Sequence, residues 1–490
     1  MENSILNLKP SKVWKHFYEL TQIPRPSGYM TEITAFIEAF GNQLGLETKR
    51  DAANNICIRK PATPGYENKP AIILQSHLDM VPQSNSDAPF DFTQDKIQAI
   101  IDGEWVKAQG TTLGADNGIG VAVILAILEA KDLEHGAIEG LFTTDEETGM
   151  YGAIAIRPGF INGKIMLNLD SEQDGELYIG CAGGADVSAQ FQYQDEAWIP
   201  KEDVAIKISL TGLKGGHSGV DIHLGRANAN KLMFRFLHEA LSTYNIRLAS
   251  VSGGSLRNAI PREAFATIVV DGKEPYKRIL EMVAGYKEVF NREFAGIENP
   301  IEFKAEFAPI TPALKLIPKD VQTRLTQAIM ACPNNVINTV AGMSTVDAVE
   351  TSTNMAIVHS SEGLTEVKFL VRSASESKKE AVCKSIESVF QLAKADVVET
   401  SNGYPGWNPN PQSPVLAVME RVYEAQNGEK PLVKVMHAGL ECGIILASVP
   451  GLDTVSFGPT IKFPHSPDEK VKIATVQKFW EYLTVLLKSI

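Results

Sequence analysis

The chain has 490 residues, more than a single hydrophobic core usually serves, so two structural units are expected. Its formal charge is −13 at pH 7, and its Lys and Arg residues are scattered rather than gathered in a stripe, which argues against nucleic acid as a partner. The five cysteines lie far apart in the sequence and form no Cys-x-x-Cys pair. We therefore expect neither a disulfide framework nor a zinc site with thiolate ligands.

The sequence carries no signal for export or for membrane insertion. Its first residues lack the basic and then apolar pattern of a signal peptide. The most apolar run, residues 119–128, is too short to span a bilayer. We therefore expect a soluble cytoplasmic protein without a membrane partner.

The first part of the chain alternates helix and strand patterns. Apolar residues recur with the helical period at 13–18 and at 33–40, which predicts two helices. A third helix is predicted at 118–131. The predicted strands are 55–59, 71–79, 138–144 and 164–170. This alternation predicts an α/β domain in which helices layer a mixed sheet.

A different pattern begins near residue 186, where the elements follow in the order β-α-β-β-α-β of a ferredoxin-like unit. They are a strand at 205–210, a helix at 227–242, strands at 246–252 and 264–270, a helix at 275–291 and a strand at 301–307. A second, looser set resembles another copy of this unit, although the sequence shows no repeat. It consists of a helix at 319–330, strands at 336–340, 355–359 and 365–372, a helix at 376–394 and a strand at 396–401.

The strand predicted at 71–79 ends in the most informative motif, a His and an Asp two residues apart. Side chains two apart on a strand point to the same side, so His77 and Asp79 could form a metal ligand beside the carboxylate that orients it. Taken alone, such a pair is more often a polar strand edge or a turn.

Four further clusters lie at predicted strand ends or in the turns beside them, where open α/β sheets place ligand sites. They are centred on Asp116, on Glu146 and Glu147, on Asp170, and on His465. Each has an ordinary alternative: a helix or turn cap for the two Asp residues, a solvated turn for the two Glu residues, and a loop position for the His. Their joint occurrence points to cations, because uncompensated carboxylates gathered at neighbouring strand ends would repel one another.

The donor types indicate which cations these would be. Two divalent ions are balanced by three ligating carboxylates and one hydroxide. Imidazole and carboxylate donors suit zinc, with manganese or cobalt as substitutes. We therefore expect two zinc ions per subunit.

Five motifs, in their family order, resemble the cocatalytic zinc peptidases related to aminoacylases and carnosinases, and especially their bacterial Xaa-His (aminoacyl-histidine) dipeptidase branch. The similarity covers the whole chain. The motifs are SHLDM at 76–80, GADNG at 114–118, DEETG at 145–149, GGHSG at 215–219 and HAGLECG at 437–443.

The resemblance implies a ligand set and a domain arrangement. Asp116 would bridge both zinc ions, His77 and Asp170 would complete one site, and Glu147 and His465 the other. The peptide bond after Asp116 would be cis. Residues 1–185 and 397–490 would form the two parts of an α/β catalytic domain. Residues 186–396 would form an α+β ferredoxin-like lid, with a duplication of the ferredoxin-like unit left open.

The resemblance also implies catalytic roles. Glu146 would be the general base, and Asp79 would hold the orientation of His77. His217, which lies between glycines on the lid, would stabilise the oxyanion, although on sequence alone an exposed turn is an equal alternative. Whether His217 acts within its own chain or across a homodimer stays open.

Five residues are expected to bind the substrate. Arg372 and Asn258 would hold the carboxylate of a dipeptide, since Arg offers a fork matched to it, although Arg372 could equally be a surface residue at a strand end. His437 and Glu441 would line the pocket near Gly439, with a packing role as the alternative for either.

The predicted function is hydrolysis of small, unblocked dipeptides, including Xaa-His substrates such as carnosine, by a metal-bridging hydroxide with Glu146 as base. An aspartate at position 170 favours this, because in the family it marks members that need a free amino terminus. An aminoacylase-type amide deacylase is the rival among enzymes. A catalytically silent peptide-binding protein is the rival of another class, and the presence of Glu146 argues against it.

Overall fold

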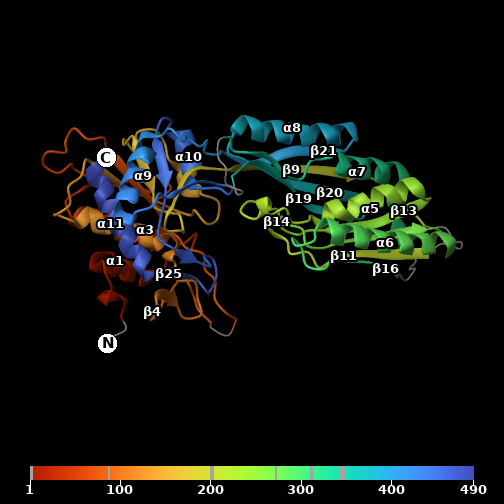
Figure 1. The fold of residues 1–490 in the computed structure, drawn as a ribbon, viewed down its shortest axis with the longest axis horizontal. Helices are drawn as coiled ribbons and strands as arrows, with labels where there is room; N and C mark the ends of the chain where they lie inside the picture. Colours follow the sequence, from red (N-terminus) through yellow and green to blue (C-terminus); the bar gives the residue numbers. More distant parts are fainter. Residues whose placement is uncertain (1–3, 87–88, 199–203, 271–272, 309–313, 342–347) are drawn as a thin grey trace. The chain divides into compact units, whose positions relative to one another are not determined.

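The computed structural model describes residues 4–86, 89–198, 204–270, 273–308, 314–341 and 348–490. The chain divides into two compact units, whose elements are labelled in Figure 1. Unit 1 consists of Met1–Gly180, Trp407–Val435 and Leu440–Ile490, and unit 2 of Cys181–Gly406 and Met436–Gly439. None of the helices in the described ranges has the length and apolar character needed to cross a bilayer.

Unit 1 is built on an eight-stranded mixed sheet. Its strands, in spatial order, are β1 (Glu47–Arg50), β2 (Ile56–Lys60), β6 (Ile138–Thr143), β3 (Ile72–His77), β7 (Ile165–Asn168), β23 (Asp453–Ser456), β8 (Glu176–Cys181) and β22 (Leu432–Met436). The strands β6, β3, β7 and β23 run parallel, and β3 and β6 are buried at every position. Parallel strands covered on both faces read as continuous apolar runs, which is why the sequence revealed them.

Helices layer this sheet. They are α1 (Ser11–Thr21), α2 (Thr31–Gln43), α3 (Ala115–Glu129), α4 (Tyr151–Ala155), α9 (Pro414–Asn427), α10 (Glu441–Ser448) and α11 (Ile473–Ser489). The helix α3 is buried along nearly its whole length and packs against α1, β3 and β6. A helix that is apolar all round must be covered all round, so α3 is the central helix of the unit. A smaller sheet completes unit 1, with β24 (Ile461–Lys462), β25 (Lys470–Lys472), β5 (Trp105–Ala108) and β4 (Ala99–Asp102) in that order.

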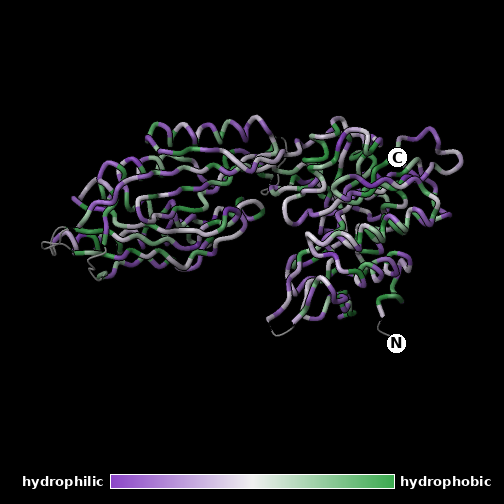
Figure 2. The backbone as a smooth tube through the Cα atoms, turned by 180° about the vertical axis from the view of Figure 1, so that it is seen from behind, coloured by the Kyte–Doolittle hydropathy of each residue, from purple (hydrophilic) through white to green (hydrophobic). Residues whose placement is uncertain are grey.

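Unit 2 is built on one nine-stranded sheet. Its strands, in spatial order, are β16 (Glu302–Phe307), β11 (Val204–Thr211), β15 (Ala264–Val270), β13 (Ile246–Gly253), β19 (Val349–Ser361), β20 (Leu364–Ser373), β9 (Gly183–Gln192) and β21 (Val397–Tyr404), with β18 (Asn335–Thr339) beside β19. Its helices are α5 (Ala229–Thr243), α6 (Lys273–Glu293), α7 (Lys319–Ala331) and α8 (Glu376–Leu392). One hydrophobic core joins these helices to the sheet. The hydropathy colours of Figure 2 alternate along the strands, as expected for a sheet with one packed face.

The strand order shows two ferredoxin-like units in this sheet. The first runs β11-α5-β13-β15-α6-β16, and its strands lie side by side in the order β16, β11, β15, β13. The second has the same spatial order, β21, β9, β20, β19. Its first strand, β9, precedes the whole first unit in sequence, so the first unit is inserted into the second. The duplication that the sequence left open is therefore present in the fold.

The unit boundaries differ from the predicted ones. The chain enters unit 2 at Cys181 rather than at residue 186, because β9 begins at Gly183. It returns to unit 1 at Trp407 rather than at residue 397, because β21 pairs with β9 and so belongs to the sheet of unit 2. The α/β class, with an inserted α+β ferredoxin-like domain, is as predicted.

Candidate metal centre

The parallel strands of unit 1 deliver polar side chains to one edge of the sheet. His77 is the last residue of β3, Glu147 follows β6, and Asp170 follows β7. Asp116 lies in the first turn of α3, and His465 lies between β24 and β25. The carboxyl ends of parallel strands meet at a common edge, so these residues converge there although they span most of the sequence.

The distances group the five side chains into two triads that share Asp116. In the first, the Nε2 atom of His77 lies 3.1 Å from Oδ1 of Asp116 and 3.3 Å from Oδ1 of Asp170. In the second, the Nε2 atom of His465 lies 3.3 Å from Oδ2 of Asp116 and 3.0 Å from Oε2 of Glu147. The two oxygens of Asp116 therefore face different triads.

This donor set fits two divalent cations. Donors about 2.0–2.1 Å from a tetrahedral zinc ion lie roughly 3.3 Å from one another. The four distances between His nitrogens and carboxylate oxygens in the triads, 3.0 to 3.3 Å, are close to that spacing. The buried atom Oε1 of Glu147 has no hydrogen-bond partner, as expected of an oxygen that could bind a cation. The peptide bond between Asp116 and Asn117 is cis, as predicted.

In the metal-free site, the carboxylates of each triad raise the pKa of the His residue beside them. Hydrogen bonds to Asp116 and Glu147 raise the pKa of His465 to about 11. Burial alone would lower the pKa of His77, but Asp170 and Asp116 raise it well above its usual value. Both imidazoles therefore hold protons that stand where cations would bind. A metal ligand must be deprotonated, so metal binding would release these protons.

Glu146 lies beside the ligand cluster. One oxygen of its carboxylate falls within 4.8 Å of donor atoms of His77 and Glu147. Desolvation and the neighbouring carboxylates Asp170 and Glu441 raise the pKa of Glu146 well above its usual value, against the opposing charge of His77. The two Glu residues thus do not form the solvated acidic turn that was the ordinary alternative.

Asp79 is buried, and its carboxylate contacts other groups besides His77. Its Oδ1 lies 3.4 Å from Nδ1 of His77 and accepts the main-chain N–H of Glu146 at 3.0 Å. Its Oδ2 accepts the N–H of Glu147 at 3.2 Å and the hydroxyl of Ser27 at 2.8 Å. Asp79 therefore ties the end of β3 to the turn after β6. The contact with Ser27, in the Pro-rich loop at 24–28, was not predicted.

In unit 2, His217 and Arg372 lie together. His217 belongs to the short strand β12 (Gly216–His217), and its Nδ1 accepts the N–H groups of Gly219 and Val220 at 3.2 Å each. The two N–H groups that Nδ1 accepts, at shorter distances than the contact of Nε2 with Arg372, favour the neutral form with its proton on Nε2. Arg372 is only 4% exposed, and its Nη2 lies 3.5 Å from that Nε2. His217 and Arg372 therefore place two hydrogen-bond donors close to each other.

Arg372 is not the surface residue of the ordinary alternative. Its Nη1 donates to the hydroxyl of Tyr404 at 3.1 Å, and its Nε has no partner. The structure gives it no carboxylate partner among the residues it describes. A buried guanidinium without an anion is costly, so Arg372 is a candidate for binding an anion.

The other predicted substrate residues are divided between the units. In unit 2, Asn258 is exposed and lines the same groove as His217, while the Nε2 of His437 lies 2.7 Å from the Oγ of Ser352. Gly439 also belongs to unit 2, whereas Glu441 begins α10 in unit 1.

Glu441 is fully buried. One oxygen accepts hydrogen bonds from Gln75 at 2.6 Å and Thr143 at 2.7 Å, whereas Oε1 has no partner. Burial raises the pKa of Glu441 to about 7. The structure therefore places a carboxylate with one unused oxygen in the domain that holds the ligand triads.

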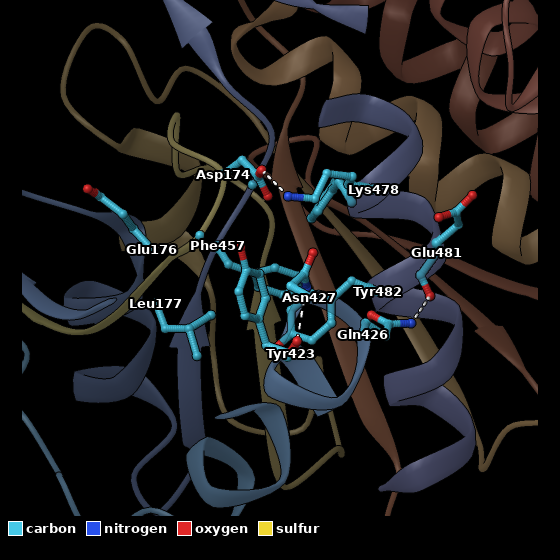
Figure 3. Close-up of a pocket in the computed structure, with 13 residues that line it drawn as sticks. Asp174, Glu176, Leu177, Tyr423, Gln426, Asn427, Phe457, Lys478, Glu481 and Tyr482 are labelled. Carbon is cyan, nitrogen blue, oxygen red and sulfur yellow. Dashed lines mark hydrogen bonds and ion pairs between the residues drawn. The ribbon is translucent and has the colours of Figure 1, made fainter. Parts of the chain in front are cut away.

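A separate pocket in unit 1 contains none of the predicted site residues. It lies between α9, α11 and the segment that leads into β8 (Figure 3). There Lys478 donates to Asp174 at 2.7 Å, and the hydroxyl of Tyr482 donates to the main chain of Met419 at 2.7 Å. The ring of Tyr482 also meets that of Tyr423 edge to face. None of the candidate metal ligands lines it, so the pocket is not part of the candidate centre.

The chain is similar to known proteins in both sequence and structure. The model of the Peptidase family M20/M25/M40 matches residues 73–489. The chain is 42% identical over 488 residues to the cytosol non-specific dipeptidase of Escherichia coli strain K12, covering 100% of this chain and 99% of the relative. The crystal structure of aminoacylhistidine dipeptidase from Vibrio alginolyticus superposes with a TM-score of 0.92 at 46% identity, covering 99% of this chain and 98% of that one.

A more distant structure shares the fold. Aminopeptidase PepT from Bacillus cereus superposes with a TM-score of 0.57 at 17% identity, over 98% of this chain and 99% of that one. The resemblance indicated by the five sequence motifs is confirmed by the family match and by the two relatives above 40% identity. The chain belongs to the Peptidase family M20/M25/M40.

Proposed function

We propose that this protein is a metal-dependent dipeptidase that hydrolyses unblocked dipeptides, including Xaa-His substrates. The observation that carries the proposal is the pair of triads that share Asp116, with Glu146 beside them. The names of the two relatives, a non-specific dipeptidase and an aminoacylhistidine dipeptidase, support the same substrate class.

We propose zinc as the cofactor, two ions per subunit, held by the first triad (His77, Asp116, Asp170) and the second triad (Asp116, Glu147, His465). Bound at these triads, divalent ions would lower the pKa of a water molecule towards about 7 and polarise the scissile carbonyl. Glu146 takes the proton of the attacking water and later gives it to the leaving amine.

Residues of unit 2 are proposed to stabilise and orient the substrate. The Nε2–H of His217 donates to the oxygen that becomes negative in the transition state. Arg372 and Asn258 bind the carboxylate of the dipeptide, and His437 and Gly439 line the pocket. The lack of a carboxylate partner for Arg372 among the described residues supports its role.

We propose that the substrate has a free amino terminus. The aspartate at position 170 supports this, because in the family that the chain resembles it marks members that act on substrates with a free amino terminus. The rival amide deacylase would prefer the acylated form. Rates with a free dipeptide and its N-acetyl derivative separate the two, and faster hydrolysis of the acetylated compound would overturn the proposal.

The name of one relative and the topology of unit 2 bear on location and assembly. The relative from Escherichia coli is named as a cytosol enzyme, and we propose a cytoplasmic location for this chain as well. Unit 2 holds two ferredoxin-like units within one sheet. We propose that this doubled lid lets His217 act within its own chain, with a homodimer formed by other surfaces left open.

Replacement of His217 by Ala is expected to lower kcat by about 10²–10³-fold, because one donor to the oxyanion is lost. The metal content should not change, since His217 belongs to neither triad. Steady-state kinetics and metal analysis check both statements. His238→Ala, an exposed position on α5, is the matched control and should keep full activity. Unchanged turnover in His217→Ala would contradict the oxyanion role.

Replacement of Arg372 by Met is expected to raise KM at least about tenfold, because a charged partner of the substrate carboxylate is removed. It should also change His217. Burial and the charge of Arg372 lower the pKa of His217 to about 4, so the ring is neutral at pH 5 to 8. Without the guanidinium, this pKa should rise towards its usual value. An NMR titration of the imidazole measures it, and an unshifted pKa together with an unchanged KM would contradict the arrangement.

A further inference from the structure

The main chain just before and at Asp116 is held by a buried carboxylate from the far end of the sequence. Glu469 is 2% exposed. Its Oε2 accepts the N–H groups of Leu113 at 2.8 Å and Gly114 at 2.9 Å. Its Oε1 accepts those of Ala115 at 2.7 Å and Asp116 at 3.1 Å. Four consecutive N–H groups therefore converge on one side chain.

Whereas Glu469 binds N–H groups of this segment, the buried guanidinium of Arg25 binds one of its carbonyl oxygens. Arg25 is 2% exposed, and its Nη2 donates to the carbonyl oxygen of Gly114. Its Nη1 donates to the carbonyl oxygens of Leu78 at 2.9 Å and Asp79 at 3.2 Å. The segment that leads to Asp116 is thus fixed to the residues that directly follow His77.

The packing leaves no room for a side chain at two glycines of this segment. Gly114 has a φ of 72°, and a Cβ built there would lie 2.5 Å from Nη2 of Arg25. A Cβ at Gly118 would lie 2.6 Å from the same atom. The residue before α3, Gly114, has no side chain to cap the helix, so Glu469 supplies that function from another part of the chain.

Glu469 also belongs to the turn that carries His465. Its N–H donates to the carbonyl oxygen of Ser466 at 2.9 Å. One side chain therefore fixes the main chain at Asp116 relative to the main chain near His465. These two residues are ligands of the second triad, where Oδ2 of Asp116 lies 3.3 Å from Nε2 of His465.

We propose that Glu469 is a positioning residue for the metal centre, which sets the spacing of Asp116 and His465 and thereby the affinity of the second triad for its cation. The inference rests on the proposed function, because it requires the second triad to bind a metal ion. A cap that serves only to stabilise α3 would alter the stability of the protein without altering that affinity.

The chain offers a matched control for this role. Glu139 is 4% exposed, and its Oε2 accepts the N–H groups of Asn162 at 2.7 Å and Gly163 at 3.0 Å. It also pairs with Arg59, whose Nε lies 2.8 Å from Oε1. Glu139 stands near the start of β6, whereas the candidate ligands gather at the other end of that strand. Both carboxylates are therefore buried acceptors of main-chain N–H groups. Of the two, only Glu469 accepts the N–H group of a triad residue, Asp116.

The test compares E469Q with E139Q in the full chain. The measurements are Zn²⁺ affinity by chelator competition, the Tm of the metal-free protein, and kcat and KM. E469Q should bind one of its two Zn²⁺ ions about 10- to 100-fold more weakly, with a lower kcat that excess Zn²⁺ partly restores and a nearly unchanged KM. E139Q should lower the Tm and leave Zn²⁺ affinity unchanged.

Three results would overturn the inference: unchanged Zn²⁺ affinity in E469Q, an equal loss in E139Q, or a loss of kcat in E469Q that excess Zn²⁺ does not restore at all. If E469Q does not fold, E469D replaces it, since the shorter side chain keeps the charge but cannot reach all four N–H groups. A wild-type protein that binds no Zn²⁺ would instead contradict the proposed function itself, so the two failures are distinguishable.

Discussion

Replacement of Glu146 by Gln is expected to lower kcat by about 10²–10⁴-fold, the usual contribution of a general base. The amide has nearly the same shape as the carboxylate but cannot take a proton from water. Glu146 lies within the ligand cluster without belonging to either triad that shares Asp116. The variant should therefore keep both metal ions and a nearly unchanged KM.

The measurements are steady-state kinetics on a dipeptide and metal analysis of the same preparation. E139Q is again the control, because it removes a buried carboxylate at the other end of β6. Near-normal turnover in Glu146→Gln with both metals bound would contradict the base assignment. Loss of a metal ion would mean that Glu146 acts as a ligand instead.

Replacement of Asp116 by Asn is expected to remove metal binding at both triads. Its two oxygens lie 3.1 Å from Nε2 of His77 and 3.3 Å from Nε2 of His465, so Asp116 is the residue that the two triads share. An amide offers one neutral oxygen in place of two charged ones. Metal affinity should fall by at least about 10²-fold, and activity should fall with it.

Metal analysis after dialysis, together with chelator competition, measures this effect. Asp174→Asn is the matched control, because Asp174 pairs with Lys478 in the separate pocket of the same unit (Figure 3). That variant should keep both metal ions. If Asp116→Asn lost only one ion and kept the other at normal affinity, Asp116 would not bridge the two triads.

The buried strands could be read from the sequence because their environment leaves a simple pattern. The strands β3 and β6 are covered on both faces, so each is a continuous apolar run followed at once by polar ligands. The strand β9 was missed although its polar and apolar residues alternate as in a half-buried strand, because it begins with two glycines, which are typical of a turn. That omission also placed the first unit boundary too late in the sequence.

The candidate ligands could be predicted because the chemistry of a metal site requires His and carboxylate side chains at strand ends. Asp79 could be predicted beside His77, but the residues that hold the main chain of the ligand segments could not. Arg25 and Glu469 act on main-chain groups, and any loop of suitable shape presents such groups whatever its side chains are. The only signals were a charged residue in a Pro-rich loop and a Glu close after His465.

The central claim is that the two triads sharing Asp116 hold the metal ions that make this chain a dipeptidase. It is tested most directly by removing the metals with a chelator, restoring Zn²⁺ in steps, and following both bound metal and hydrolysis of an unblocked Xaa-His dipeptide. We predict no activity in the metal-free protein and full activity as the second Zn²⁺ ion binds. Full activity in the metal-free protein, or none in a protein with two bound Zn²⁺ ions across a panel of dipeptides, would contradict the account.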